Sequence, residues 1–164
     1  MDVIVRKHQL LKDSKDFVDM PLKKAPSDII EAWKSVDKED KAKIQQFLKT
    51  NFEQPESELE QCTPTDFKPN PKSLSRIKDS RYRQWAMQLN ERWKSLCRKM
   101  KSTVRDHPER HSLLFVPNLF IIPGGRFREF YYWDTYWIVK GLLASEMYET
   151  AKGMIFNLAE FVYR

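Results

Sequence analysis

The chain has few residues that could bind a metal ion and no segment that could cross a membrane. Its 164 residues include two cysteines and three histidines, which are scattered without the close spacing of a metal site. No run approaches the roughly 18 consecutive apolar residues of a membrane-spanning helix. We therefore expect no metal centre and no membrane-spanning helix. Ordinary hydrophobic content and abundant aromatic residues exclude a disordered protein.

Signals for secretion are also missing. The N-terminus, Met1–Lys7, becomes charged too early for a secretory signal peptide. No Asn-x-Ser/Thr acceptor for N-glycosylation occurs, so glycosylation gives no indication of secretion. We expect either that the protein stays inside the cell or that its true beginning is missing from this sequence.

The net charge of +6 is spread along the chain rather than concentrated in a basic block. From residue 111 onward basic and acidic residues balance, so the whole excess lies in residues 1–110. Within that part the two signs are interspersed, whereas a nucleic-acid-binding surface would gather Lys and Arg into a stripe. The charge distribution therefore predicts a solvated helical surface and no nucleic-acid partner.

The sequence leaves open whether its two cysteines, Cys62 and Cys97, form a disulfide. Cys97 falls on the apolar face of a predicted helix. This position favours a buried free thiol, which packs like a small apolar side chain.

Periodic apolar residues predict a series of helices joined by polar loops. Ser27 and Asp37 are candidate N-caps for the first two. Residues 53–72 are rich in proline, which precludes a regular element there and predicts a linker that runs across a larger body. Further helices are predicted at residues 80–101, 133–148 and 149–164, the last reaching Arg164 without a closing Gly, Asn or Pro. No alternating strand series or internal repeat appears, so we expect an all-α fold.

The helix at residues 80–101 has the clearest apolar stripe. Apolar residues recur at spacings of three and four, which predicts that Trp85 and Trp93 lie in the core. The stripe consists of Tyr82, Trp85, Ala86, Leu89, Trp93, Leu96, Cys97 and Met100. The opposite, solvent-facing side consists of Arg83, Asn90, Lys94 and Lys101.

An unusually aromatic segment follows two adjacent glycines near the C-terminus. Gly124 and Gly125 permit positive φ, and Arg126 carries a rigid fork of donors. Seven aromatic residues occur between Phe127 and Trp137. Flat rings can stack on a pyranose while Arg and Asp hydrogen-bond its hydroxyls, so the segment has the chemistry of a sugar site.

A structural alternative also fits this segment. The two glycines alone make a turn, and aromatic residues at helical spacing usually belong to a core, so the residues by themselves favour the entry to a buried helix. We assign Tyr131, Tyr132 and Tyr136 mainly to the core. If the helix has already begun, Glu129 and Asp134 project about 140° apart, which argues against the opposed carboxylates of a glycosidase.

The run from Pro123 to Tyr136 resembles the first signature of the trehalases. That pattern requires Pro-Gly-Gly-Arg-Phe and then Glu, Tyr, Trp-Asp and Tyr at set offsets, all of which are present. The resemblance is closest to animal-type trehalases and covers nearly the whole chain. It also includes residues 17–20, 63–66, 83–85 and 137–139.

The resemblance implies an (α/α)₆ toroid that hydrolyses α,α-trehalose to two glucose molecules with inversion, and without a metal or other cofactor. It implies that Arg126, Trp133 and Asp134 contact the substrate and that Phe127 lines the pocket. The family's general acid is an Asp in a Gln-Trp-Asp triplet and its general base is a more distant Glu. Here Gln84-Trp85 is followed by Ala86, so neither catalytic carboxylate is found.

We therefore expect the N-terminal portion of a trehalase, inactive and marginally folded when alone. Residues 1–78 would hold N-terminal helices and the proline-rich linker. Residues 79–164 would hold the first helices of the barrel and the signature loop, 123–136. The family analogy suggests a secreted or membrane-anchored parent enzyme, and the oligomeric state stays open. Two alternatives are a non-catalytic sugar-binding or regulatory form and an unrelated basic protein that binds polyanions.

Overall fold

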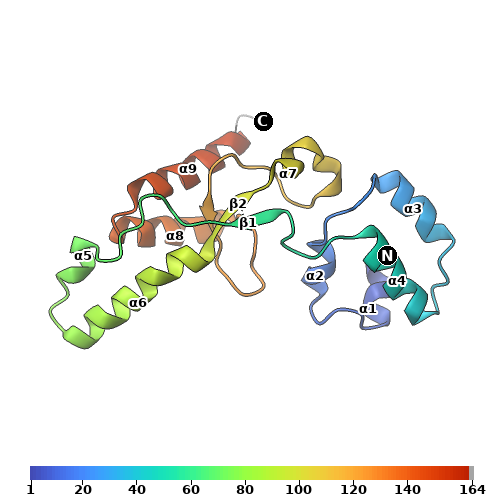
Figure 1. The fold of residues 1–164 in the computed structure, drawn as a ribbon, viewed down its shortest axis with the longest axis horizontal. Coiled ribbons are helices and arrows are strands. Elements are labelled where there is room, and N and C mark those ends of the chain that lie inside the picture. Colours follow the sequence, from blue (N-terminus) through green and yellow to red (C-terminus); the bar gives the residue numbers. More distant parts are fainter. Residues whose placement is uncertain (163–164) are drawn as a thin grey trace. The chain divides into compact units, whose positions relative to one another are not determined.

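The computed structural model describes residues 1–162 and is mostly helical, with one small sheet (Figure 1). The helices are α1 (Asp2–Lys7), α2 (Ser14–Val18), α3 (Pro26–Lys34), α4 (Lys41–Asn51), α5 (Lys72–Ser75), α6 (Ser80–Leu96), α7 (Ser102–Asp106), η1 (Pro108–Arg110), α8 (Tyr132–Ala144) and α9 (Tyr148–Val162). The strands are β1 (Leu59–Gln61), β2 (Cys97–Met100) and β3 (Phe120–Ile121). The predicted final residues of the last helix, 163–164, lie outside the described residues.

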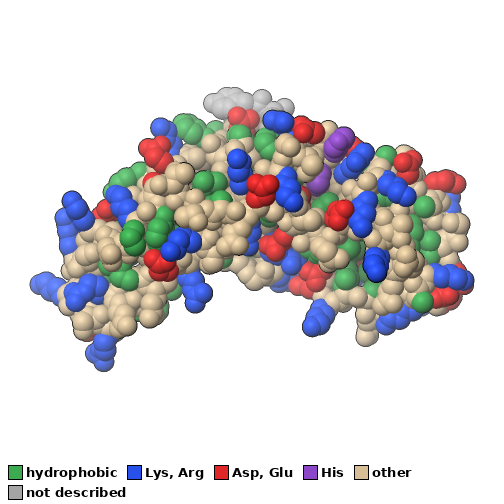
Figure 2. Space-filling view, viewed as in Figure 1, with side chains coloured by type: hydrophobic (Ala, Val, Ile, Leu, Met, Phe, Trp, Pro, Cys, Tyr) green, Lys and Arg blue, Asp and Glu red, His purple; other side chains and the backbone are tan. Residues whose placement is uncertain are grey.

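The chain forms two compact units. The first contains residues 1–58 and 101–115, and the second contains residues 59–100 together with the chain from Val116 onward. Figure 2 shows acidic and basic side chains interspersed over the face in view. Within residues 1–162, no helix is both long enough and apolar enough to span a bilayer.

The first unit is built on a small aromatic and aliphatic core. This core contains the buried side chains of Val5, Ile29, Phe47, Leu48 and Phe52. The two predicted N-caps were wrong. Helix α3 begins at Pro26, with Ala25 as its N-cap, two residues earlier than Ser27 as N-cap would place it, and the fixed φ of proline suits a first helical turn. Helix α4 is capped by Asp40, whose carboxylate accepts two backbone N–H groups, whereas Asp37 accepts the N–H of Glu39.

The second unit contains a three-stranded antiparallel sheet in the order β1-β2-β3. The expectation of an all-α fold was therefore wrong in this part. The helix predicted over 80–101 ends at Leu96, because residues 97–100 pair with strands on both sides instead of continuing the helix. The proline-rich linker, 53–72, also holds strand β1, a regular element that the prediction excluded, and α5 begins at its last residue.

Cys62 and Cys97 form a disulfide, so the prediction of a free thiol was wrong. Cys97 is fully buried, as expected, but it belongs to β2 and not to a helix. The register that pairs Gln61 with Arg98 places Cys62 directly opposite Cys97, with a Cα–Cα distance of 5.1 Å. This is the separation at which a disulfide closes without moving the backbone.

Helix α6 packs through the face that was predicted to be solvated. Asn90 is 2% exposed and donates to the carbonyl of Lys68 at 2.8 Å. Arg83 donates to the carbonyl of Ile77, and the Lys94 ammonium lies 4.8 Å from the Phe67 ring centroid. Residues 67–77 therefore cover this polar face, which agrees with a linker that runs across a larger body.

The apolar side of α6 is left largely open. Trp85 is 59% exposed, so its predicted place in the core was wrong, and Tyr82 and Leu89 are exposed as well. Trp93 is half-buried and is the one predicted core tryptophan that packs closely. Its ring lies against Gly141 of α8, and its indole N–H donates to Ser145 at 2.9 Å.

Candidate functional site

A closed four-residue turn carries Arg126. Gly124 and Phe127 exchange two backbone hydrogen bonds, of 3.2 and 3.1 Å. Gly124 and Gly125 both have positive φ, at 101° and 61°, which residues with a Cβ rarely adopt. Arg126 therefore sits at the tip of a tight turn, exposed to solvent.

The turn is held against the end of α6. The backbone N–H of Ile122 donates to the carbonyl of Leu96 at 3.0 Å. A Cβ built on Gly124 would lie 3.1 Å from the Leu96 side chain, closer than ordinary contact. Glycine at 124 is thus required both by φ and by its close approach to Leu96.

Asp134 lies in the first turn of α8. Tyr131, the residue before α8, adopts an extended conformation, and its carbonyl accepts a hydrogen bond from the hydroxyl of Thr135. A carboxylate in a first helical turn is favoured by the positive end of the helix dipole. Asp134 is half-buried, so the residue is partly accessible from solvent.

The two predicted stacking rings are both exposed, Phe127 by 48% and Trp133 by 69%. Phe127 packs edge-on to Tyr131 at 5.9 Å, and the Arg126 guanidinium lies 5.8 Å from the Phe127 ring. Trp133 packs edge-on to Trp137 at 6.0 Å. Among residues 1–162 no ring contact joins Phe127 to Trp133, so the structure leaves these rings in two separate groups.

Two of the three tyrosines assigned to the core are on the surface. Tyr132 is 80% exposed and Tyr136 is 56% exposed, so their assignment was wrong; Tyr131 is half-buried. Helical spacing identified a common face, but only part of it is covered, since Leu142 is fully buried whereas Tyr132 and Tyr136 are exposed. Sequence reasoning could not distinguish an exposed aromatic surface from a core, because both have the same periodicity.

An open groove of about 430 Å³ lies between α8 and α9 and was not predicted. Its lining includes Trp133, Tyr136, Val139, Ile155 and Leu158. Trp133 is the one predicted site residue among its walls, since Arg126, Phe127 and Asp134 do not line it. The groove and the Gly-Gly turn are therefore distinct features that share the start of α8.

Glu129 precedes the first helical residue, Tyr132. The condition for a 140° separation from Asp134 is thus not met, and that geometric argument against the pair does not apply. Within the described part of the chain, no group of three His, Cys, Asp or Glu side chains could hold a metal ion.

Comparison with known proteins agrees with the signature. The trehalase family model matches residues 9–164. Human trehalase is 44% identical over 96% of this chain, and the chain spans 28% of that protein. The trehalases of Apis mellifera and Tenebrio molitor are each 46% identical over 93% and 97% of the chain, which spans 25% and 29% of them. The chain belongs to the trehalase family.

Proposed function

We propose that this chain is the substrate-binding N-terminal portion of an α,α-trehalase, an inverting glycosidase that releases two glucose molecules. The observation that carries the proposal is the signature turn. The turn has solvent-exposed Arg126 at its tip and ends at the exposed ring of Phe127. The first turn of α8, a few residues later, carries the Asp134 carboxylate and the exposed ring of Trp133. The chain belongs to the trehalase family, whose name gives trehalose as the substrate.

Each site residue supplies a different contact in this proposal. Arg126 donates to hydroxyls through its fork, and Asp134 accepts from a pair of hydroxyls on one sugar ring. Phe127 and Trp133 present apolar faces to the C–H face of a pyranose. Because trehalose is uncharged, binding by these residues depends on hydrogen bonds and stacking rather than on net charge.

The acid and base are not among these residues in the proposal. Inversion needs one carboxylic acid on the glycosidic oxygen and one carboxylate on water, about 6.5–9.5 Å apart. The Gln-Trp-Asp triplet that carries the acid is absent, since Ala86 follows Gln84-Trp85. We therefore expect these 164 residues to bind trehalose without cleaving it.

The exposed apolar faces support a larger helical toroid. Tyr82, Trp85 and Leu89 are exposed on α6, and Ile155 and Phe156 are exposed on α9. Contiguous apolar surface of this kind usually meets another element. In the proposed toroid, residues 1–78 precede the barrel and 79–164 supply its first helices.

The disulfide bears on where the protein folds. Disulfides persist in oxidising compartments and are rare in the cytosol. The Cys62–Cys97 bond therefore supports a secreted or membrane-anchored parent enzyme.

Trehalose titration of the 164-residue chain tests the proposal. Backbone amide NMR signals of Gly124, Phe127 and Asp134 should shift in a saturable manner, and no glucose should form. The dissociation constant should be the same at about 50 mM and 500 mM salt, because electrostatic binding weakens steeply with salt whereas binding of a neutral sugar does not. Heparin serves as the polyanion control.

Three results would contradict the proposal. Glucose release would show that the chain contains its own acid and base. Absence of shifts at the turn, in a sample whose α8 and α9 signals show it to be folded, would remove the binding role. Salt-sensitive binding of heparin without binding of trehalose would favour the polyanion alternative.

A further inference from the structure

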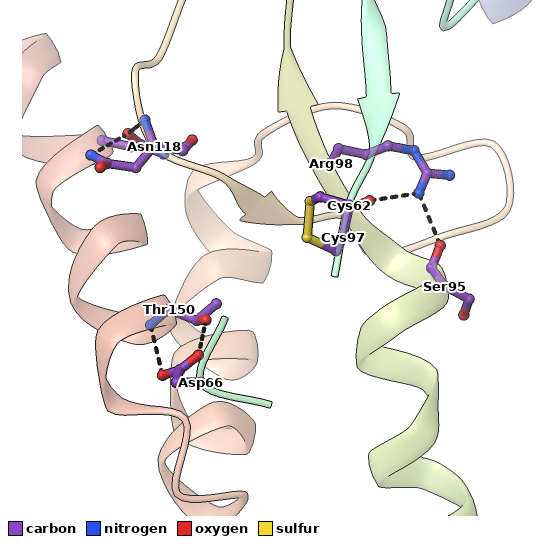
Figure 3. The surroundings of a disulfide bond; sticks show 8 residues. Cys62, Asp66, Ser95, Cys97, Arg98, Asn118 and Thr150 are labelled. Atoms are coloured by element: carbon purple, nitrogen blue, oxygen red, sulfur yellow. Dashed lines mark hydrogen bonds between the residues drawn. A yellow bond between two sulfur atoms is a disulfide. The ribbon is translucent and has the colours of Figure 1, made fainter. Parts of the chain in front are cut away.

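Cys97 connects two parts of the second unit that are distant in sequence. On one side its sulfur is bonded to Cys62, whose backbone N–H also donates to the Cys97 carbonyl at 3.2 Å. On the other side Cys97 pairs with Ile121 in the antiparallel ladder of β2 and β3. Figure 3 shows the disulfide where α6 gives way to the strand.

A short series of contacts leads from this disulfide to the substrate turn. Leu96, the residue before Cys97, accepts the N–H of Ile122, the residue after Ile121. The Leu96 side chain also packs closely against Gly124, where an added Cβ would push the leucine aside. Arg126 follows two residues later at the tip of the turn. Cys97 is thus linked to the turn through its neighbour Leu96, which bonds to Ile122 and packs against Gly124.

We infer that the Cys62–Cys97 disulfide is a positioning element for the turn that presents Arg126 to the sugar. The inference rests on the proposed function for its readout in activity. The disulfide would fix the register of β2 and, through Leu96, the place of Ile122 and Gly124. Cys62 and Cys97 are positioning residues in this account, because neither touches the substrate.

The shortness of the strands is the reason why a covalent bond is needed here. Strand β1 has three residues and β3 has two. Strands of this length have few ladder hydrogen bonds, and a pair of strands by itself is only marginally stable in water. A hydrogen-bonding side chain must stay within about 0.5 Å of its productive place. The disulfide supplies a constraint that two or three ladder bonds do not.

Arg98 reinforces the same junction. Its guanidinium donates to the carbonyls of Ser95 and Cys97, at 2.9 and 3.0 Å (Figure 3). The first bond satisfies a carbonyl at the end of α6, where the helix leaves its last acceptors unpaired, and the second reaches the first residue of β2. The end of α6 and the start of β2 are therefore held by a side chain as well as by the disulfide.

The test is the double variant Cys62→Ala/Cys97→Ala in the natural polypeptide that contains these residues. Alanine is chosen because Cys97 is fully buried and serine would bury a hydroxyl. We expect kcat/KM for trehalose to fall by about 10–100-fold, since a misplacement of about 1 Å at a binding group can cost as much as about 10²-fold. Amide hydrogen exchange at Ile122, Gly124 and Phe127 should accelerate, while exchange in α9 should not.

Asp66→Ala is the matched control. Asp66 lies four residues after Cys62, and its carboxylate is bonded to the start of α9 rather than to the turn. It should lower stability while leaving kcat/KM and exchange at the turn unchanged. If the double variant does not fold, brief reduction of the folded polypeptide with dithiothreitol gives the same comparison, and reoxidation should restore kcat/KM.

The outcomes separate this inference from the proposed function. Unchanged exchange at the turn, or acceleration equal to that in α9, would overturn the positioning role. Faster exchange at the turn with unchanged kcat/KM would also overturn it, provided that Arg126→Ala lowers kcat/KM. If Arg126→Ala leaves kcat/KM unchanged too, the proposed binding role of the turn fails, and hydrogen exchange alone then shows whether the disulfide holds the turn in place.

Discussion

The carboxylate of Asp66 accepts the backbone N–H of Thr150 at 3.0 Å, across 84 residues of sequence. It also accepts the hydroxyl of Thr150, as Figure 3 shows, and the N–H of Glu149 at 2.8 Å. These are the donors that an N-cap side chain normally satisfies. Met147, which precedes α9, has no side-chain oxygen, so a residue of the proline-rich segment performs the capping from a distance.

Replacing Asp66 by alanine should therefore destabilise the second unit. The loss of an N-cap carboxylate costs about 1 kcal/mol, within a range of about 0.5–2 kcal/mol. Urea unfolding of the variant and of the native polypeptide would measure this loss of stability. Asp66→Asn keeps one acceptor oxygen and should lose less. Equal stability of all three proteins would show that the start of α9 is satisfied in another way.

Gly141→Ala tests the close packing of α6 on α8. The added Cβ would lie 2.9 and 3.0 Å from two atoms of the Trp93 ring, which is held by its bond to Ser145. Overpacking of this kind costs about 1–3 kcal/mol.

Gly153→Ala, in the interior of α9, is the control for that substitution. Its Cβ would meet the nearest atom, Cβ of Asn118, at 3.4 Å, and alanine is favoured over glycine in a helix by about 1 kcal/mol. The free energy of unfolding should thus be clearly lower for Gly141→Ala than for Gly153→Ala. A Gly141→Ala variant as stable as Gly153→Ala would mean that Trp93 moves aside.

Glu146 should make stability depend on pH. Its carboxylate accepts the Ser73 N–H at 2.9 Å and an ammonium hydrogen of Lys68 at 3.2 Å. The Ser73 hydrogen bond, followed by Lys68, holds the pKa of Glu146 below its usual value. A lowered folded-state pKa stabilises the fold above the unfolded-state pKa, and this contribution is lost as the pH falls through the folded-state value.

The variant Glu146→Gln should accordingly have a lower Tm than the native protein at pH 7, and the difference should shrink below about pH 4. Gln keeps the size of the side chain at a position with positive φ. Glu91→Gln, in an exposed ion pair with Lys94, is the control and should change Tm little. A Tm difference for Glu146→Gln that stays constant with pH would contradict the assigned ionic contribution.

The sequence predicted the two C-terminal helices well, because their apolar residues recur at helical spacing and their boundaries shift by only a few residues. It predicted α6 as a helix but assigned it the wrong buried face. Periodicity locates the apolar stripe, yet which face is covered depends on residues 67–77, whose contacts with Asn90 and Arg83 are not visible in a local pattern. The sheet was missed since its strands have two to four residues, too few to show alternation.

The candidate site was found through the signature and not through physical pattern alone. From the residues, the Gly-Gly turn and the aromatic run fitted a structural element better than a sugar site. The structure adds the positive φ of Gly124 and its closure onto Leu96, which explain why glycine is needed there. The disulfide could not be predicted, because pairing depends on the register of β1 and β2.

The measurement that tests the central claim most directly is kcat/KM for trehalose with Arg126→Ala in the natural polypeptide. Arg81→Ala, on a side chain that is 90% exposed in α6, is the control for loss of one positive charge. If Arg126 donates hydrogen bonds to the sugar in the transition state, Arg126→Ala should lower kcat/KM by about 10²–10³-fold, as removal of a transition-state donor does. Arg81→Ala should leave kcat/KM almost unchanged. An unchanged kcat/KM for Arg126→Ala in a folded protein would contradict the account.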